Sequence, residues 1–211
     1  MLPSDRTPET THHGAAAEPV RPQRADGRRN QARVLEEAFA AFAAHGAAVP
    51  IREIARRAGV STGTVTRHFP TKQALFQAVA LHRIEQLVRT AEDIAAREHP
   101  ATAFFTFFAF LVRQSAADHA VGDALTGAGF DLQAAASTAI SDFGEAMAGL
   151  LTRAQQAGAV RDDVDTADVK ALIAGCIARG DDDAARQRMI EIAGDGLRPR
   201  PARAPGRVNA D

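Results

Sequence analysis

The stretch "IREIARRAGVSTGTVTRHFPTK", residues 51–72, decides the fold. Its first apolar side chains repeat with the helical spacing i, i+3, i+4, i+7, at Ile51, Ile54, Ala55 and Ala58. Gly59 then interrupts the pattern, and Ser61 is a residue type that caps the start of a new helix. The stretch therefore predicts two short helices joined by a tight turn, which is a helix-turn-helix.

The turn "AGVS" sets the frame of this motif. Ala55 is small enough for the two helix backbones to approach each other, and Gly59 allows the positive φ that the turn requires. Val60 and Val65 are expected to fill the junction between the helices. With that frame set, the side chains that point outward from the second helix are Thr62, Gly63, Thr64, Thr66 and Arg67.

These outward residue types suit a DNA groove. Threonine offers a hydroxyl to phosphates or base edges and a methyl to thymine, and arginine forks onto guanine. Gly63 lets the backbone come close to a duplex. His68 and Lys72 lie where they would hold phosphates, and the amides of Thr71 and Lys72 would do so at the start of the next helix.

Helical periodicity continues through the rest of the chain. Segments with this spacing are expected at about 28–45, 50–58, 61–68, 71–97, 101–118, 120–125, 132–157 and 166–179, with a last helix ending at 197. Thr71 and Thr166 are expected caps, and Gly46 fits a left-handed helix stop. The pattern predicts an all-α fold of about nine helices, with a disordered arm at 1–23 and a disordered tail at 198–211.

The composition of the 211 residues narrows the class of protein. The single cysteine, Cys176, leaves no internal disulfide, which favours a reducing compartment. No apolar run reaches the roughly 20 residues of a membrane span, and the N-terminus has no signal-like apolar segment. We therefore expect a soluble, cytoplasmic protein. His12 and His13 are expected to have no role, and no metal or cofactor is expected.

Charge is distributed unevenly along the chain. Residues 24–72 hold nine basic and four acidic side chains, a net charge of +5, whereas residues 73–211 hold 14 basic and 19 acidic ones, a net charge of −5. A basic head on an acidic body indicates a polyanionic partner for the head. A solvated basic face is the alternative that charge alone leaves open.

The ordered run "IREIARRAGVSTGTVTRHFPTKQALFQAV", with the upstream helix "RRNQARVLEEAFAAFAAHG", resembles the DNA-binding head of the TetR family of transcriptional regulators. The resemblance covers about residues 28–87. It implies a helix-turn-helix DNA-binding domain at 24–87, a helical ligand-binding and dimerisation domain at 88–197, and double-stranded DNA, a small-molecule effector and a second copy of the chain as partners.

The resemblance also implies roles for single residues. Thr64 and Arg67 would contact base edges, and the phosphate contacts would come from Ser61, Thr62, His68 and Lys72. Arg28 and Arg29 would lie near the backbone or the minor groove, or simply be solvated. Thr66 stands where the family usually carries tyrosine. The threonine side chain is shorter and does not reach as far toward the DNA. A solvated face is the favoured interpretation of Arg52, Arg56 and Arg57.

Two sets of residues in the body are candidates for the dimer interface and the ligand pocket that such a regulator would need. Dimerisation through the last two helices would use Val169, Leu172, Ile173, Cys176, Met189, Ile190, Ala193 and Leu197, unless these only complete the monomer core. A ligand pocket would use Phe104, Phe107, Phe108, Leu111, Gln114, His119 and Gln133. The phenylalanines surround most of their helix, so a purely structural core is the favoured interpretation of them and the pocket is the alternative.

We therefore expect a ligand-responsive repressor that binds a pseudo-palindromic operator as a homodimer. A helical binding protein without DNA readout is the first alternative, although a packing surface at 62–67 would be apolar. An all-α enzyme is the second alternative. The body has no Glu-x-x-His pair, no nucleophile beside a base and no nucleotide loop.

Overall fold

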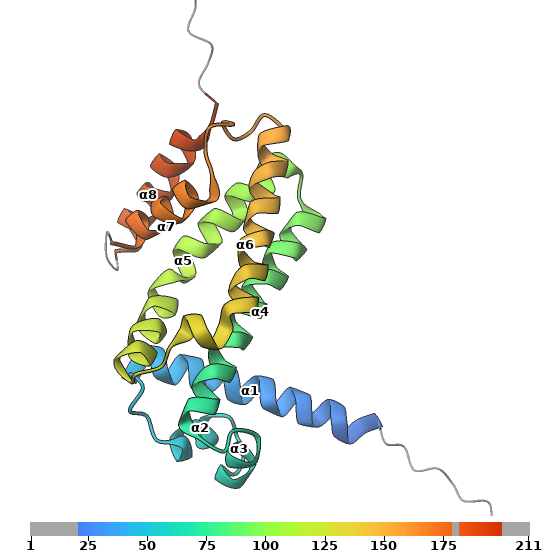
Figure 1. The fold of residues 1–211 in the computed structure, drawn as a ribbon, viewed down its shortest axis with the longest axis vertical. Coiled ribbons are helices and arrows are strands. Elements are labelled where there is room, and N and C mark those ends of the chain that lie inside the picture. The colour runs from blue at the N-terminus through green and yellow to red at the C-terminus, as the bar shows by residue number, and fades with distance from the viewer. Residues whose placement is uncertain (1–20, 179–181, 200–211) are drawn as a thin grey trace, which may run out of the picture.

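The computed structural model describes residues 21–178 and 182–199 (Figure 1). Within these ranges the regular structure is entirely helical, which confirms the predicted all-α class. The eight helices are α1 (Arg21–His45), α2 (Ile51–Arg57), α3 (Thr62–His68), α4 (Lys72–Arg97), α5 (Pro100–Gly127), α6 (Leu132–Gln156), α7 (Thr166–Ala178) and α8 (Asp183–Leu197). None of the helices in the described ranges is long and apolar enough to span a bilayer.

Two helices are longer than the sequence pattern predicts. α1 begins at Arg21 rather than near residue 28, so residues 21–23 of the expected arm are helical; Pro22 fits its first turn, where a missing N–H costs nothing. α5 runs without a break through His119, joining the segments expected at 101–118 and 120–125. The residues around His119 are mostly alanine and include no proline, so nothing there stops the helix. The rest of the arm, with His12 and His13, and residues 200–211 of the tail lie outside the described ranges.

The cap of α7 also differs from the prediction. The carboxylate of Asp165, rather than Thr166, accepts hydrogen bonds from the backbone N–H groups of Ala167 and Asp168, at 2.8 and 2.9 Å. Asp168 in turn accepts from the N–H of Asp165 at 3.1 Å. This reciprocal pair satisfies donors at the helix start as a capping box does, which leaves Thr166 inside the first turn.

One hydrophobic core holds the N-terminal helices together. Phe42 of α1 is fully buried and meets the ring of Phe76 of α4 edge to face, with centroids 5.1 Å apart. Ile54 of α2 and Val65 of α3 are completely buried against them. Truncating a buried phenylalanine of this kind to alanine costs about 3–5 kcal/mol. The core therefore fixes the helix-turn-helix onto α1 and α4.

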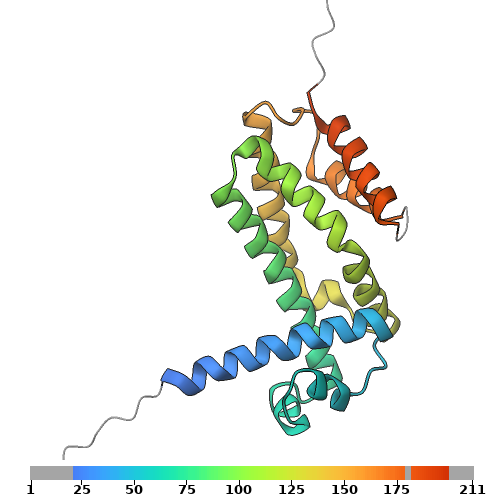
Figure 2. The same ribbon diagram turned by 180° about the vertical axis from the view of Figure 1, so that it is seen from behind.

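A second core fills the body between α4, α5, α6, α7 and α8. Its largest buried side chains include Phe104, Phe107 and Phe108 of α5 and Met147 and Leu150 of α6. Phe104 stacks on Phe108 with centroids 6.4 Å apart. Figures 1 and 2 show α7 and α8 beside α5, toward the end of the molecule opposite α2 and α3.

Two long helices connect the cores. α4 begins in the first core and extends into the second, and its 26 residues reach about 39 Å. α5 runs in the opposite direction, so its C-terminal residues Val121 and Leu125 are buried in the first core. α6 begins beside that end of α5 and is kinked at Ala136, where φ is −132° and ψ is 22°.

Candidate nucleic-acid interface

The recognition helix α3 is short and amphipathic. Val65, in its middle, and Phe69, directly after it, are buried and anchor the helix on the first core. Thr62, Gly63 and Thr66 are exposed on its opposite side, as are Arg67 and His68, and Thr64 is half-buried. The structure therefore presents the predicted polar residues together on one outward face.

The turn before α3 has the predicted geometry. Gly59 has φ of 65°, the left-handed region that side chains disfavour. The N–H of Val60 donates to the carbonyl oxygen of Ala55 at 3.0 Å, and Ala55 is buried. The hydroxyl oxygen of Ser61 accepts from the N–H of Thr64 at 3.0 Å, which confirms Ser61 as the cap of α3.

The hydroxyls of Thr64 and Thr66 already have partners in α3 or at its cap. The hydroxyl of Thr66 donates to the carbonyl oxygens of Thr62 and Gly63, at 3.1 and 3.3 Å. This internal bonding turns the hydroxyl toward the backbone and leaves the methyl group as the outward part of Thr66. The hydroxyl of Thr64 lies 2.9 Å from that of Ser61. Neither contact is visible in the sequence pattern.

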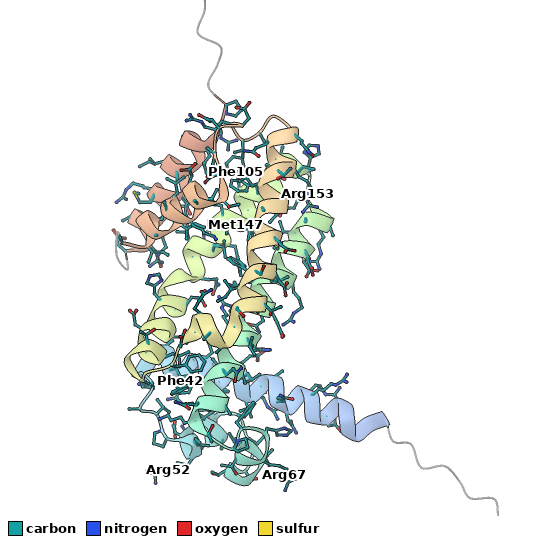
Figure 3. All side chains as sticks on the ribbon, in the orientation of Figure 1. Phe42, Arg52, Arg67, Phe105, Met147 and Arg153 are labelled. Carbon is teal, nitrogen blue, oxygen red and sulfur yellow. The ribbon has the colours of Figure 1, made fainter. Side chains whose placement is uncertain are left out.

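Basic groups flank this face. Figure 3 shows Arg67 and Arg52 at the end of the molecule farthest from α7 and α8. Within the described part of the chain, the side chain of Arg67 forms no hydrogen bond or ion pair, so its guanidinium is available to a partner. Thr71 caps α4 by accepting from the N–H of Ala74 at 3.0 Å, and the ammonium of Lys72 lies 5.9 Å from the ring centroid of Phe76.

Arg28 and Arg29 lie in the N-terminal third of α1, which projects beyond the other helices (Figures 1 and 2). Both side chains are exposed, and Arg29 forms an ion pair with Asp26 one turn earlier. The structure therefore places these two arginines on a helix that extends away from α3. They do not join the face formed by residues 62–68.

The basic residues of α2 are partly neutralised by Glu53. Its carboxylate accepts from Arg56 at 2.9 and 2.7 Å and from Arg57 at 2.9 Å. These hydrogen bonds, first from Arg56 and then from Arg57, lower the pKa of Glu53 to about 2. Arg57 also lies 3.0 Å from His45 of α1. Two of the three α2 arginines are thus engaged locally, and Arg52 is exposed.

Known families and structures account for both parts of the chain. The profile of the bacterial regulatory proteins of the tetR family matches residues 34–79, and that of the SbtR-like transcriptional regulator C-terminal domain matches residues 99–199. A TetR transcription regulatory protein from Mycobacterium vanbaalenii is 48% identical, with a TM-score of 0.75 over 84% of this chain and 100% of its own. The chain belongs to the TetR family. It is therefore a DNA-binding transcriptional regulator and not an enzyme.

Other TetR-fold structures agree at lower identity. A TetR transcriptional regulator from Streptomyces coelicolor, SCO0520, is 28% identical with a TM-score of 0.71, over 81% of this chain and 99% of its own. FadR from Bacillus subtilis, solved with stearoyl-CoA, shares the fold at 18% identity, with a TM-score of 0.57 over 78% and 98%. No curated protein sequence matches the chain significantly.

The residues predicted for a ligand pocket do not gather around one cavity. Phe104, Phe107, Phe108 and Leu111 are buried in the second core, whereas Gln114, His119 and Gln133 are exposed. Leu111 and His119 line a cavity of about 250 Å³ between α5, α6 and α7. A second cavity, lined by residues of α1, α4, α5 and α6, was missed by sequence reasoning. In the described portion no three His, Cys, Asp or Glu side chains gather as metal ligands.

The residues predicted for a TetR-type dimer interface divide into two groups. Val169, Cys176, Ile190, Ala193 and Leu197 are buried within the chain itself, and burial raises the pKa of the Cys176 thiol. Leu172 is 36% exposed, and Ile173 and Met189 are half-buried. Ile192, at 64% the most exposed large apolar side chain among the described residues, was missed, although it lies three residues after Met189.

Proposed function

We propose that this TetR-family regulator represses transcription by binding a pseudo-palindromic operator as a homodimer and releases it when a small molecule binds the body. The observation that carries the proposal is the outward polar face of α3, anchored from behind by Val65 and Phe69. Two such helices in a dimer would read two half-sites in successive major grooves. As a transcriptional regulator that binds DNA, it acts in the cytoplasm.

The contacts that we assign on α3 follow from exposure and chemistry. Arg67 forks onto a guanine, and Thr64 contacts a neighbouring base edge. Thr66 offers its methyl group to a thymine, since its hydroxyl is bonded inside the helix. Gly63 allows a close backbone approach, and phosphates are held by the remaining polar groups near both ends of α3 and the start of α4: Ser61, Thr62, His68, Thr71 and Lys72.

Arg28 and Arg29 take a separate part in this scheme. They belong to the projecting end of α1 rather than to the face of α3. We assign them to the DNA backbone or the minor groove beside the α3 contact. Their exposed guanidinium groups suit either site, and the contribution is electrostatic.

The dimer that we propose forms through α7 and α8. A groove of about 490 Å³ runs between them, lined by small and apolar residues that include Ala171, Leu172, Gly175, Ile192 and Gly196. A second copy would bury Leu172 and Ile192, which the single chain leaves in water. Of the residues predicted for this role, Leu172, Ile173 and Met189 remain accessible, and the buried ones support the surface from below.

The small molecule that we propose as the effector would bind in the helical body. The TetR fold of FadR holds stearoyl-CoA, so this helical architecture accommodates a ligand. The two cavities described above, of about 160 and 250 Å³, lie against α5, which links the body to the first core. A ligand against α5 is therefore positioned to shift the first core, and couplings between sites are typically about 1–3 kcal/mol.

Selection of bound fragments from random duplex DNA, at a low and a high salt concentration, tests the DNA-binding part. We expect enrichment of one inverted repeat at both concentrations, with a steep loss of total affinity at high salt. Enrichment of a single unrepeated site would contradict the dimer. Salt-sensitive binding without an enriched sequence would contradict base readout by α3.

A further inference from the structure

A mostly apolar cavity of about 160 Å³ lies where α1, α4, α5 and α6 meet. The face of α5 that lines it has the spacing i, i+3, i+4, i+7, with Asp118, Val121, Gly122 and Leu125. Phe39 comes from α1, Leu132 from α6, and the α4 wall includes Val79, Arg83 and Leu87. The cavity therefore touches helices of both cores at once.

Among the described residues that line it, the two charged ones, Arg83 and Asp118, neutralise each other. The guanidinium of Arg83 donates to both carboxylate oxygens of Asp118, from Nε at 2.5 Å and from Nη2 at 2.9 Å. The same guanidinium lies 5.2 Å from the ring centroid of Phe39. A charged ligand here would bring an unpaired charge into an apolar site, which is costly. The cavity therefore favours a neutral occupant.

Volume limits the occupant further. A dry apolar cavity of about 150 Å³ in another protein holds benzene. A cavity of this size fits one ring or two small fused rings. The carboxylate of Asp118 has acceptor capacity beyond its two bonds to Arg83. One hydroxyl or N–H group on the ligand would therefore find an acceptor.

We propose that this cavity is the effector site of the regulator and binds a small, neutral, mainly apolar ring compound with one hydrogen-bond donor directed at Asp118. The regulatory meaning of the site rests on the proposed function. Because the walls come from α1 of the first core and from α4, α5 and α6, an occupant contacts the helices that would have to move to release DNA.

Indole is a suitable first probe, since it is neutral and has one N–H donor. The chain has no tryptophan or tyrosine, so indole fluorescence reports the probe alone. We expect saturable binding with a dissociation constant of about 0.1–1 mM, in keeping with the modest affinity of so small a ligand. Absence of saturable binding would overturn the proposed ligand class.

Gly122 allows the cavity to be filled from its own wall. A Cβ atom built there meets nothing within 4 Å, and replacing a helical glycine favours the helix. Indole binding should weaken in steps through Gly122→Ala and Gly122→Val. It should be lost completely with Gly122→Leu. Gly144→Leu on α6, also free of neighbours within 4 Å, is the matched control and should bind as the parent does. Unchanged binding across the Gly122 series would overturn the site.

Two competitors test the charge argument, and DNA tests the effector role. Benzyl alcohol should displace indole, whereas benzoate should not; the reverse order would overturn the neutral class.

Saturating indole should lower operator affinity for the parent and for Gly144→Leu but not for Gly122→Leu. Indole binding that left operator affinity unchanged would overturn the effector role alone. Failure to bind operator without indole would instead refute the proposed function.

Discussion

Arg83 of α4 and Asp118 of α5 form a two-pronged ion pair that joins the two long helices close to the first core, with side chains only 18% and 26% exposed. Since both charges are largely withdrawn from water, removal of one partner leaves the other poorly solvated. The pair also holds Arg83 over the ring of Phe39 of α1. Three helices thus meet at one guanidinium.

A double-mutant cycle with Arg83→Met and Asp118→Asn should give a coupling free energy of about 1–2 kcal/mol, between the values for exposed and buried pairs. The measurement is chemical denaturation of the four proteins. The exposed pair of Arg89 and Glu85, 3.6 Å apart on α4, is the matched control. It should give no more than about 0.5 kcal/mol. Equal couplings for the two pairs would contradict the argument from burial.

Arg67→Ala should lower operator affinity by about 1–3 kcal/mol and relax the preference at one base pair. Its guanidinium has no partner among the described residues, so its loss removes a DNA contact without disturbing the fold. Affinity for an operator library with every base varied is the measurement.

Lys72→Ala tests a phosphate contact, in contrast to the base contact that Arg67→Ala tests. It should weaken binding to every sequence and reduce the slope of affinity against salt by about one unit, as the loss of one phosphate contact does. A change of base preference with Lys72→Ala, or none with Arg67→Ala, would reverse the two assignments.

Gly59→Ala should lower the free energy of unfolding by about 1 kcal/mol, because φ of 65° is costly for a residue with a Cβ atom. Nothing lies within 4 Å of that Cβ, so backbone strain is the only penalty. Gly144→Ala, at a helical glycine with equal space, should instead stabilise by about 0.5–1 kcal/mol. Denaturant unfolding of both variants distinguishes the two effects; the same sign for both would refute the assignment.

Ile192→Asp should weaken self-association by about tenfold or more while leaving the monomer folded, since the side chain is 64% exposed in the single chain. Sedimentation at several concentrations measures this. Glu191→Lys is the control on the same helix, with a side chain that points about 100° away. A monomeric parent protein, or equal weakening by both variants, would exclude this face as the dimer interface.

Glu53→Gln should change how stability depends on pH. The pKa of Glu53 is lowered from 4.5 to about 2, so its contribution is fully present above about pH 4.5 and is lost as the pH falls toward 2. The difference in melting temperature between parent and variant should shrink over that interval. Arg56→Gln combined with Arg57→Gln should remove the same dependence. A constant difference down to pH 2 would show that the pairs do not act on stability.

Local sequence rules were sufficient for the helix-turn-helix. Gly59 at positive φ, the cap at Ser61, the cap at Thr71 and the burial of Val65 each follow from one residue type at one position. The φ of Gly59 and the two caps depend on neighbours within four residues, and the burial of Val65 follows from its place as the apolar residue among the polar ones of α3. They are therefore visible without a tertiary structure.

The cavity and the exposed apolar surface were not predictable in this way. Arg83 and Asp118 are 35 residues apart, and nothing in either segment marks them as partners. Whether Leu172 or Val169 faces water depends on how α7 packs against α5 and α8, which periodicity does not specify. The start of α1 and the continuity of α5 were missed because breaks were assigned where no proline or turn required them.

The course of α5 limits how this protein can be divided or recombined. Val121 and Leu125, far along the sequence from residues 34–80, complete the core that supports the recognition helix. A fragment that ended at residue 87 would lose both and expose the apolar surfaces of α1 and α4 that they cover. A chimera that transfers the DNA-binding specificity to another body would therefore have to include the last turns of α5 together with the N-terminal helices.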